Sequence, residues 1–193
     1  MGNIKPLKSK KKIKVILDHL KEVDITGRDH LLFYFGIHSP LRISEILNLR
    51  MRDVFWEKYR YREYVRIKEN RTGKLKLVNI SVNVLKRLKT YARKHRLKPE
   101  DYIFFSKHDR SKPLDIVSAY KMLNKAAFNV GARNVGTHTL RKTFGYHHYQ
   151  KHREIGLLMQ LFGHSSAKVT YKYLGINPER ADNPYDNLDC DLY

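Results

Sequence analysis

Two arginines, two histidines and a tyrosine stand in three short segments that are far apart in the 193-residue sequence. Arginine holds two oxygens of an anionic group at once and stays charged at any working pH. Histidine exchanges protons near neutral pH, and a tyrosine hydroxyl is a nucleophile once its proton is removed. Together these residue types suit a reaction in which negative charge grows on oxygen atoms. In chain order the candidates are Arg42, His138, Arg141, His164 and Tyr173.

Each segment has an ordinary structural explanation when it is taken alone. The spacing of His138 and Arg141 puts both side chains on one face of a helix, but such a pair is more often a surface or capping pair. The Gly163-His164 step is typical of a helix C-terminus, where histidine compensates the helix dipole. Only the order and spacing of the three segments in combination indicate a function.

In this combination the segments resemble the tyrosine recombinases, the phage integrase family. That family's pattern is an arginine, a hairpin lysine, His-x-x-Arg, a histidine and a tyrosine. Roughly 95 residues separate Arg42 from the second segment, and Tyr173 follows His164 by nine residues. The resemblance covers about residues 23–175. It implies that Arg42 is the family's first arginine, that His138 and Arg141 are its central pair, that His164 is its later histidine and that Tyr173 is its nucleophile.

The reaction that the resemblance implies is breakage and rejoining of DNA through a covalent 3′-phosphotyrosine. The phosphodiester gains a second negative charge as the nucleophile adds, so two arginines and His164 would stabilise it without a metal ion or any other cofactor. A tyrosine hydroxyl is about three pKa units too weak an acid to ionise at neutral pH, which makes His138 the candidate base. The link to tyrosine keeps the phosphodiester energy, so no ATP is needed.

Tyr171 competes with Tyr173 for the role of nucleophile. Residues two apart on a helix point about 200° from each other, so only one of the two can face the phosphate. The family's nine-residue step from the histidine selects Tyr173. The alternative for either tyrosine is a packing role, since the chain contains 13 tyrosines.

The family's general acid, a lysine in the hairpin turn, has no direct match. Arg71 occupies that position, and arginine is a poor proton donor because its pKa exceeds about 12. We expect Lys74 to protonate the leaving 5′ oxygen and Arg71 to contact DNA. Lys68 and Lys76 lie nearby and are further expected DNA contacts.

The elements that must position these residues are mainly helical. Apolar periodicity predicts helices over residues 10–22, 29–37, 42–49, 82–95, 111–130, 137–151, 153–162 and 166–173. Residues 64–68 and 74–78 alternate apolar and basic side chains around a turn at residues 70–73, which predicts a β-hairpin with a cationic polar side. The expected fold class is mainly α with a small antiparallel β-sheet, an α+β fold.

The charge of the chain indicates a polyanionic partner. The sequence has 39 Lys and Arg against 19 Asp and Glu, a formal charge of +20, which is more than solubility requires. Double-stranded DNA is the leading partner. A membrane is the weaker alternative, because no run approaches about 18 apolar residues and the start lacks a signal peptide's apolar region. We expect a soluble, cytoplasmic, nucleoid-associated protein of a prokaryote or mobile element, in which the single Cys190 is a bystander.

Three parts are expected along the chain: a basic arm with a first helix over residues 1–22, the catalytic domain over residues 23–175 and an acidic tail over residues 176–193. Family members usually carry an N-terminal DNA-clamping domain, whereas only some twenty residues precede the catalytic unit here. We therefore expect the arm to contact DNA through Lys10, Lys11 and Lys12, or a partner protein to help; the alternative for the lysines is a solvated charge run. The resemblance also implies a tetramer on DNA and a monomer or dimer when free.

Two rival functions use the same features. A DNA-binding regulator that keeps the fold without catalysis would explain Arg71 in the lysine position, and a type IB topoisomerase would use similar chemistry to relax DNA. A metal hydrolase based on His147, His148 and His152 is not favoured, because we expect these adjacent and i+4/i+5 histidines to lack a carboxylate or cysteine companion.

Overall fold

The computed structural model describes residues 4–68, 73, 75–132, 135–136 and 138–177. The expected fold class is confirmed, because helices dominate and the described strands form a two-stranded antiparallel sheet. In order, the elements are α1 (Lys10–Val23), α2 (Arg28–Ile37), α3 (Ile43–Leu47), α4 (Met51–Val54), the 3-10 turn η1 (Glu57–Tyr59), β1 (Val65–Lys68), β2 (Leu75–Val78), α5 (Val82–Lys94), α6 (Ile116–Phe128), α7 (Thr139–His152), α8 (Ile155–Phe162) and α9 (Ala167–Leu174).

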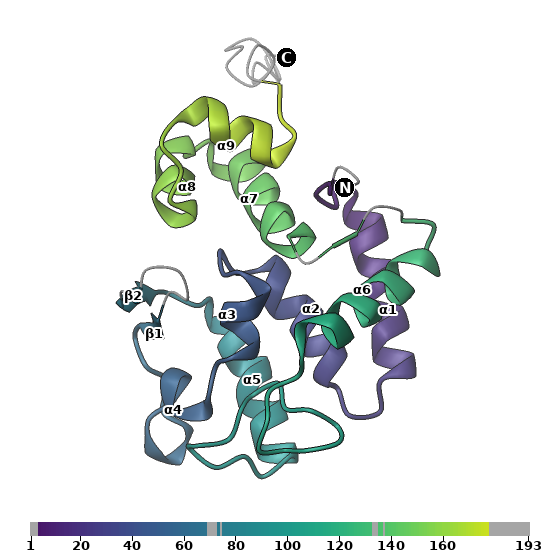
Figure 1. Ribbon diagram of the computed structural model, residues 1–193, viewed down its shortest axis with the longest axis vertical. Coiled ribbons are helices and arrows are strands. Elements are labelled where there is room, and N and C mark those ends of the chain that lie inside the picture. Colours follow the sequence, from purple (N-terminus) through teal and green to yellow (C-terminus); the bar gives the residue numbers. More distant parts are fainter. Residues whose placement is uncertain (1–3, 69–72, 74, 133–134, 137, 178–193) are drawn as a thin grey trace, which may run out of the picture.

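The main body is built around α2, which lies at its centre and packs against α1, α3, α5, α6 and α7 (Figure 1). The residues of α2 are apolar around most of the circumference, as the sequence predicted, and Leu32, Phe33 and Phe35 are almost fully buried. Helix α1 contributes Ile16 and Leu20 to the same hydrophobic core. The first helix therefore shares the core of the segment expected to be catalytic.

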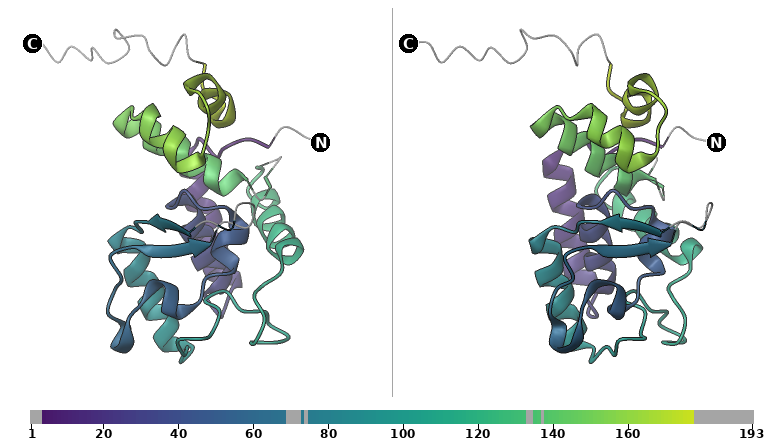
Figure 2. Two further views of the ribbon diagram at one scale, coloured as in Figure 1. Left: turned by 60° about the vertical axis from the view of Figure 1, so that its left-hand side comes forward. Right: turned by 90° about the vertical axis from the view of Figure 1, so that its left-hand side faces the viewer.

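Helices α7, α8 and α9 form a second unit above the main body (Figures 1 and 2). This unit has a small hydrophobic core of its own, which includes Tyr149, Leu158 and Phe162. Helix α7 of this unit crosses over α2 of the main body, where a Cβ on Gly36 would collide with the side chain of Leu140. Glycine lets the two helices approach closely at this crossing.

The helix expected from Ser111 begins later than predicted. Pro113 lies before the helix and forms an isolated β-bridge with Phe105. Helix α6 starts at Ile116, because the side chain of Asp115 accepts hydrogen bonds from the N–H groups of the first turn. The short α4 and η1 were not predicted, since each is too short to show the i, i+3, i+4 spacing of apolar residues.

The predicted hairpin is confirmed, with Val65 opposite Val78 and Ile67 opposite Lys76. Its expected cationic side is wrong for β2. Leu75 and Leu77 are exposed, at 72% and 62%, and Lys76 faces inward on the same side of the sheet as Val78. The turn residues 69–72 and Lys74 lie outside the described residues, as does the acidic segment from residue 178.

Candidate active site

Arg42 is held at the start of α3 by Glu45. As the N-cap residue, Arg42 donates its backbone N–H to Glu45 Oε2 at 2.6 Å, and its Nη1 lies 3.2 Å from Glu45 Oε1. Glu45 is only 5% exposed, so the carboxylate is a fixed anchor, while the Arg42 side chain remains 40% exposed. The guanidinium is thus oriented by its neighbour and still open to a ligand.

Arg141 is fixed more tightly, on the first turn of α7. It is 4% exposed, donates from Nε to the Pro40 carbonyl at 2.6 Å and donates from Nη2 to the Leu161 carbonyl at 3.1 Å. Pro40 precedes Arg42 by two residues, so the turn that carries Arg42 also holds the side chain of Arg141. Because the guanidinium of Arg141 is already oriented, its side chain loses little conformational freedom when an anion binds.

His138 and His164 both have a pKa below the usual histidine value. Desolvation lowers the pKa of His138, and the cations of Arg141, Lys142 and Arg42 lower it further. Desolvation, Arg141 and Arg42 act on the pKa of His164 in the same direction. The neutral imidazole is therefore favoured at pH 7, and only a neutral ring can accept a proton.

The ring of His164 is oriented by Thr170. Its Nδ1 lies 3.0 Å from Thr170 Oγ1, whose hydroxyl donates to the Ser166 carbonyl at 3.2 Å. Because that hydroxyl already donates to a carbonyl, we assign Nδ1 of His164 as the donor to Thr170.

Tyr173 packs against the segment that carries His164, and its hydroxyl is buried. Its ring lies 5.0 Å from that of His164 and 5.4 Å from that of Phe162. The hydroxyl oxygen is buried and has no hydrogen-bond partner among the described residues. Burial raises the pKa of Tyr173, and Arg141 and Arg42 oppose that rise.

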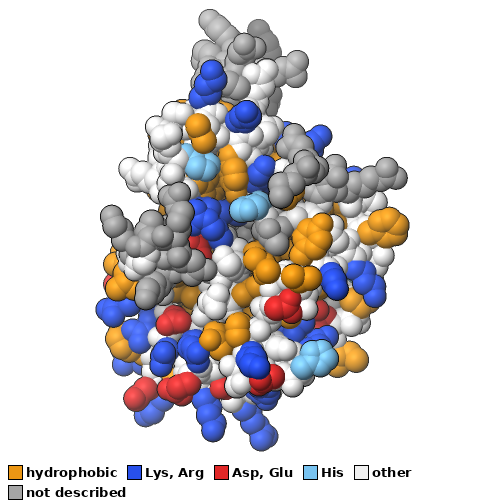
Figure 3. Space-filling view, viewed as in Figure 1, with side chains coloured by type: hydrophobic (Ala, Val, Ile, Leu, Met, Phe, Trp, Pro, Cys, Tyr) orange, Lys and Arg blue, Asp and Glu red, His pale blue; other side chains and the backbone are white. Residues whose placement is uncertain are grey.

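The same two guanidiniums thus act on His138, His164 and Tyr173, and the five residues together come from three separate segments of the sequence. In the space-filling view, histidine side chains flank Lys or Arg side chains in the hollow below the α7–α9 unit (Figure 3). The fold therefore brings the five predicted residues within electrostatic reach of one another.

Lys76 lies at this site, although its sequence position indicated only a DNA contact. Its Nζ donates to the Leu161 carbonyl at 2.7 Å, the same carbonyl that accepts from Arg141. Lys76 shares a face of β2 with Val78, but the apolar Leu75 and Leu77 indicated the other face as the buried one, so the sequence did not show that Lys76 points inward. Arg71, Lys74 and the side chain of Lys68 lie outside the described residues.

Lys142 also lies at this site, although no motif in the sequence pointed to it. Its Nζ lies 4.9 Å from the centre of the Tyr173 ring, and burial lowers the pKa of this lysine. The one available signal was its position directly after Arg141.

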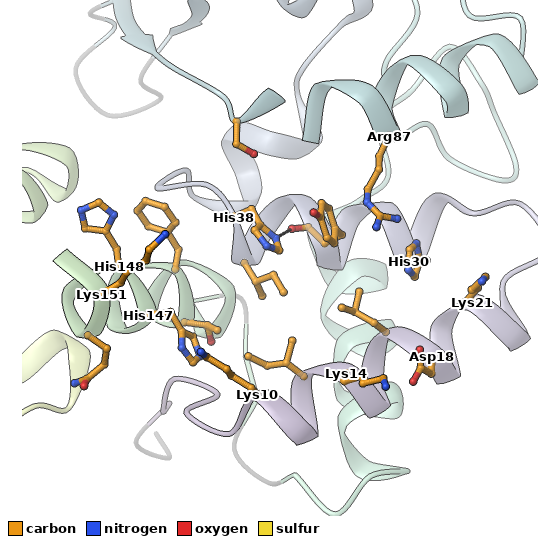
Figure 4. A pocket seen from close by; sticks show the side chains of 18 of the residues that line it. Lys10, Lys14, Asp18, Lys21, His30, His38, Arg87, His147, His148 and Lys151 are labelled. Atoms are coloured by element: carbon orange, nitrogen blue, oxygen red, sulfur yellow. Dashed lines mark hydrogen bonds between the residues drawn. The ribbon is translucent and has the colours of Figure 1, made fainter. Parts of the chain in front are cut away.

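A separate pocket of about 1160 Å³ lies between α1, α2, α5 and α7 (Figure 4). Thr143 and His147 line it, and by helix geometry they point roughly 120–160° away from Arg141.

Lys10 lines the same pocket, and Lys11 and Lys12 are exposed on α1. His147, His148 and His152 also reach this pocket, and Glu154 Oε2 lies 3.0 Å from Nε2 of His148, so the expectation that these histidines lack a carboxylate companion is wrong. No group of three or more potential metal ligands is found within the described part of the chain. No helix of that part is long and apolar enough to cross a membrane.

Comparison with known proteins gives a consistent family assignment. The sequence pattern of the phage integrase family matches residues 8–180. A probable integrase/recombinase of Bacillus subtilis, YoeC, is 35% identical over 185 residues, which cover 96% of this chain and 97% of the relative. The tyrosine recombinase XerA of Pyrococcus horikoshii is 29% identical over 84% of this chain.

Solved structures share the fold. A crystal structure of XerH recombinase superposes with a TM-score of 0.72 over 93% of this chain at 23% identity. The chain spans about half the length of these Xer proteins, covering 53% of XerA and 52% of the XerH chain. Since the family pattern covers most of the sequence, the chain belongs to the phage integrase family and has the catalytic domain of a tyrosine recombinase, a DNA breaking and rejoining enzyme.

Proposed function

We propose that this chain recombines double-stranded DNA at specific sites through a covalent 3′-phosphotyrosine, with Tyr173 as the nucleophile. The observation that carries the proposal is the placement of Arg141 between the carbonyls of Pro40 and Leu161. This placement sets it beside the turn that carries Arg42 and beside the segment in which the His164 ring packs 5.0 Å from that of Tyr173. Solved structures of the same fold include XerH bound to its difH substrate and a lambda integrase dimer bound to a core site, which supports DNA as the partner.

In this mechanism the scissile phosphate binds between the two guanidiniums. Arg141 is buried and oriented by two carbonyls, and Arg42 is oriented by Glu45, so both can stabilise the charge that grows on the non-bridging oxygens. Nε2 of His164 is the ring nitrogen not used by Thr170 and supplies a further contact when protonated.

The bond from Tyr173 Oη to phosphorus forms as the bond from phosphorus to the 5′ oxygen breaks. His138 takes the tyrosine proton, in keeping with its lowered pKa. The hydroxyl of Tyr173 is buried in this structure, so the attack requires a movement that brings it to the phosphate.

The departing 5′ oxygen needs a proton from a hairpin residue. We retain Lys74 as the proposed donor, with Arg71 and Lys68 as DNA contacts. Lys76 is the second candidate, because its ammonium is already within reach of the carbonyl that orients Arg141. A substrate with sulphur in place of the bridging 5′ oxygen needs no proton and identifies the donor, since it should restore cleavage only in the alanine variant of that residue.

Residues 23–175 would carry out this chemistry, with α1 completing their core. We further propose that four copies act together on DNA and that the free protein is a monomer or dimer. Sedimentation of the protein with and without its DNA site measures both states. The proposed contacts of Lys10, Lys11 and Lys12 with DNA would lie on α1, where Lys10 lines the pocket on the side of α7 that faces away from Arg141.

The deciding experiment is incubation with a suicide DNA substrate followed by denaturing electrophoresis. Wild-type protein and Tyr171→Phe should form a covalent adduct, and Tyr173→Phe should not. DNA binding without an adduct would indicate the non-catalytic regulator. An adduct and plasmid relaxation at any sequence, without exchange between two sites, would indicate a type IB topoisomerase.

A further inference from the structure

The segment before α1, expected to be a DNA-binding arm, packs along α7. The backbone N–H of Leu7 donates to Thr143 Oγ1 at 2.9 Å, and the Leu7 carbonyl lies 2.9 Å from Nε2 of His147. Thr143 and His147 are four residues apart and so lie on one face of the helix. Leu7 itself is 8% exposed and belongs to the core of the main body. This part of the chain therefore connects the main body to α7.

The two ends of the segment reach the surroundings of the nucleophile. On one side Ile4 accepts a hydrogen bond at its carbonyl from Lys142 Nζ at 2.8 Å. On the other, Lys8 Nζ donates to the carbonyl of Gly175 at 2.7 Å, at the C-terminal end of α9. Both views of Figure 2 show the N-terminal segment passing beside the α7–α9 unit. The segment thus holds α7 and α9 together from outside.

Lys142 links this segment to Tyr173. Its ammonium is held by the Ile4 carbonyl and lies over the Tyr173 ring at 4.9 Å. A cation over an aromatic face is attracted to the ring, and the attraction is greater for the phenolate than for the neutral phenol. The arrangement therefore favours the deprotonated nucleophile in a setting where burial opposes it.

We propose that residues 4–8 are a strap that positions the helix bearing the nucleophile, and that Lys142 is the positioning residue through which the strap acts on Tyr173. The catalytic consequence rests on the proposed function, because it assumes that Tyr173 attacks the phosphate. The structural consequence, a tie between residues 4–8 and α9, does not depend on activity.

The chain offers a matched pair of lysines for the test. Lys8 is tied to Gly175 and lies over the Tyr146 ring, whereas Lys5 is exposed and makes no hydrogen bond or ring contact with any other described residue. Lys8→Ala and Lys5→Ala remove the same charge from the same segment. If these lysines only attract DNA, the two variants should weaken binding equally and leave α9 unchanged.

Hydrogen exchange of the DNA-free protein tests the strap directly. Amides of α9 should exchange several-fold faster in Lys8→Ala than in Lys5→Ala, because one tie on the helix end is lost. Equal exchange in the two variants would overturn the strap. Lys8 is exposed, so its replacement should leave the fold intact.

Single-turnover cleavage of the suicide substrate, measured from pH 6 to pH 9, tests Lys142. We expect Lys142→Met to cleave about tenfold more slowly at neutral pH, with DNA affinity nearly unchanged, and Lys142→Arg to keep most of the rate. The loss in Lys142→Met should shrink as the pH rises, because solvent then takes the tyrosine proton more easily. A wild-type rate, or a loss that is the same at every pH, would refute the role of Lys142. If wild-type protein formed no adduct, the proposed function would fail while the exchange experiment still tested the strap.

Discussion

The buried hydroxyl of Tyr173 allows a prediction in which stability and activity change in opposite directions. Tyr173→Phe keeps the ring that packs on His164 and Phe162 and removes only an oxygen that has no partner among the described residues. A polar group buried without a hydrogen bond costs about 1–3 kcal/mol. The variant should therefore be more stable than wild type by about 1 kcal/mol, although it should form no DNA adduct.

For a chain of this size a gain of about 1 kcal/mol corresponds to a rise in Tm of about 2–4 °C. Tyr171→Phe is the matched control, because the Tyr171 hydroxyl lies 3.3 Å from the hydroxyl of Tyr149, and both residues are buried. Its removal breaks that hydrogen bond and should lower the stability by about 1 kcal/mol while leaving the adduct intact.

The assay is thermal unfolding of both variants without DNA, followed by the adduct assay on the same preparations. The expected order of Tm is Tyr173→Phe, wild type, Tyr171→Phe. A lower Tm for Tyr173→Phe than for wild type would mean that the hydroxyl gains a favourable interaction in the DNA-free protein. That result would refute the inference that the nucleophile is buried at a cost.

Three further predictions concern the rest of the site. Arg141→Ala should reduce cleavage far more than DNA binding, because Arg141 faces charge that develops in the transition state; equal losses in filter-binding and cleavage assays would make it an ordinary phosphate contact. The cleavage rate should stay constant as the pH is lowered to about 6.5 and should decline only at lower pH, because the pKa of His138 is lowered and a base must be neutral. A cleavage rate that already declines above about pH 6.5 would argue against His138 as the base. Gly145→Ala should destabilise the α7–α9 unit by about 1–3 kcal/mol in chemical unfolding, because the added methyl group would lie 2.7 Å from the Phe162 ring; an unchanged midpoint would show that the ring can move aside.

The sequence by itself determined the fold class and most of the helices. The apolar residues of α2 and the i, i+3, i+4 pattern of α3 are local consequences of burial, so periodicity located both helices to within a few residues. Order and spacing also predicted five site residues through the resemblance to one family, and the catalytic roles of these residues stay predictions. The start of α6 was misplaced, since a cap at Asp115 decides it and not the apolar pattern.

The tertiary structure decided which groups hold the site in place. The carbonyls of Pro40 and Leu161 orient Arg141, and a carbonyl has no signature in sequence because every residue carries one. The N-terminal segment was misjudged for the same reason. Its lysines indicated a free basic arm, whereas the backbone of Leu7 is hydrogen-bonded to Thr143 of α7, 136 positions away in the sequence. The inward direction of Lys76 likewise followed from which face of β2 the core covers. Side-chain types can be read along the chain, but backbone partners and facing directions exist only once distant segments are packed together.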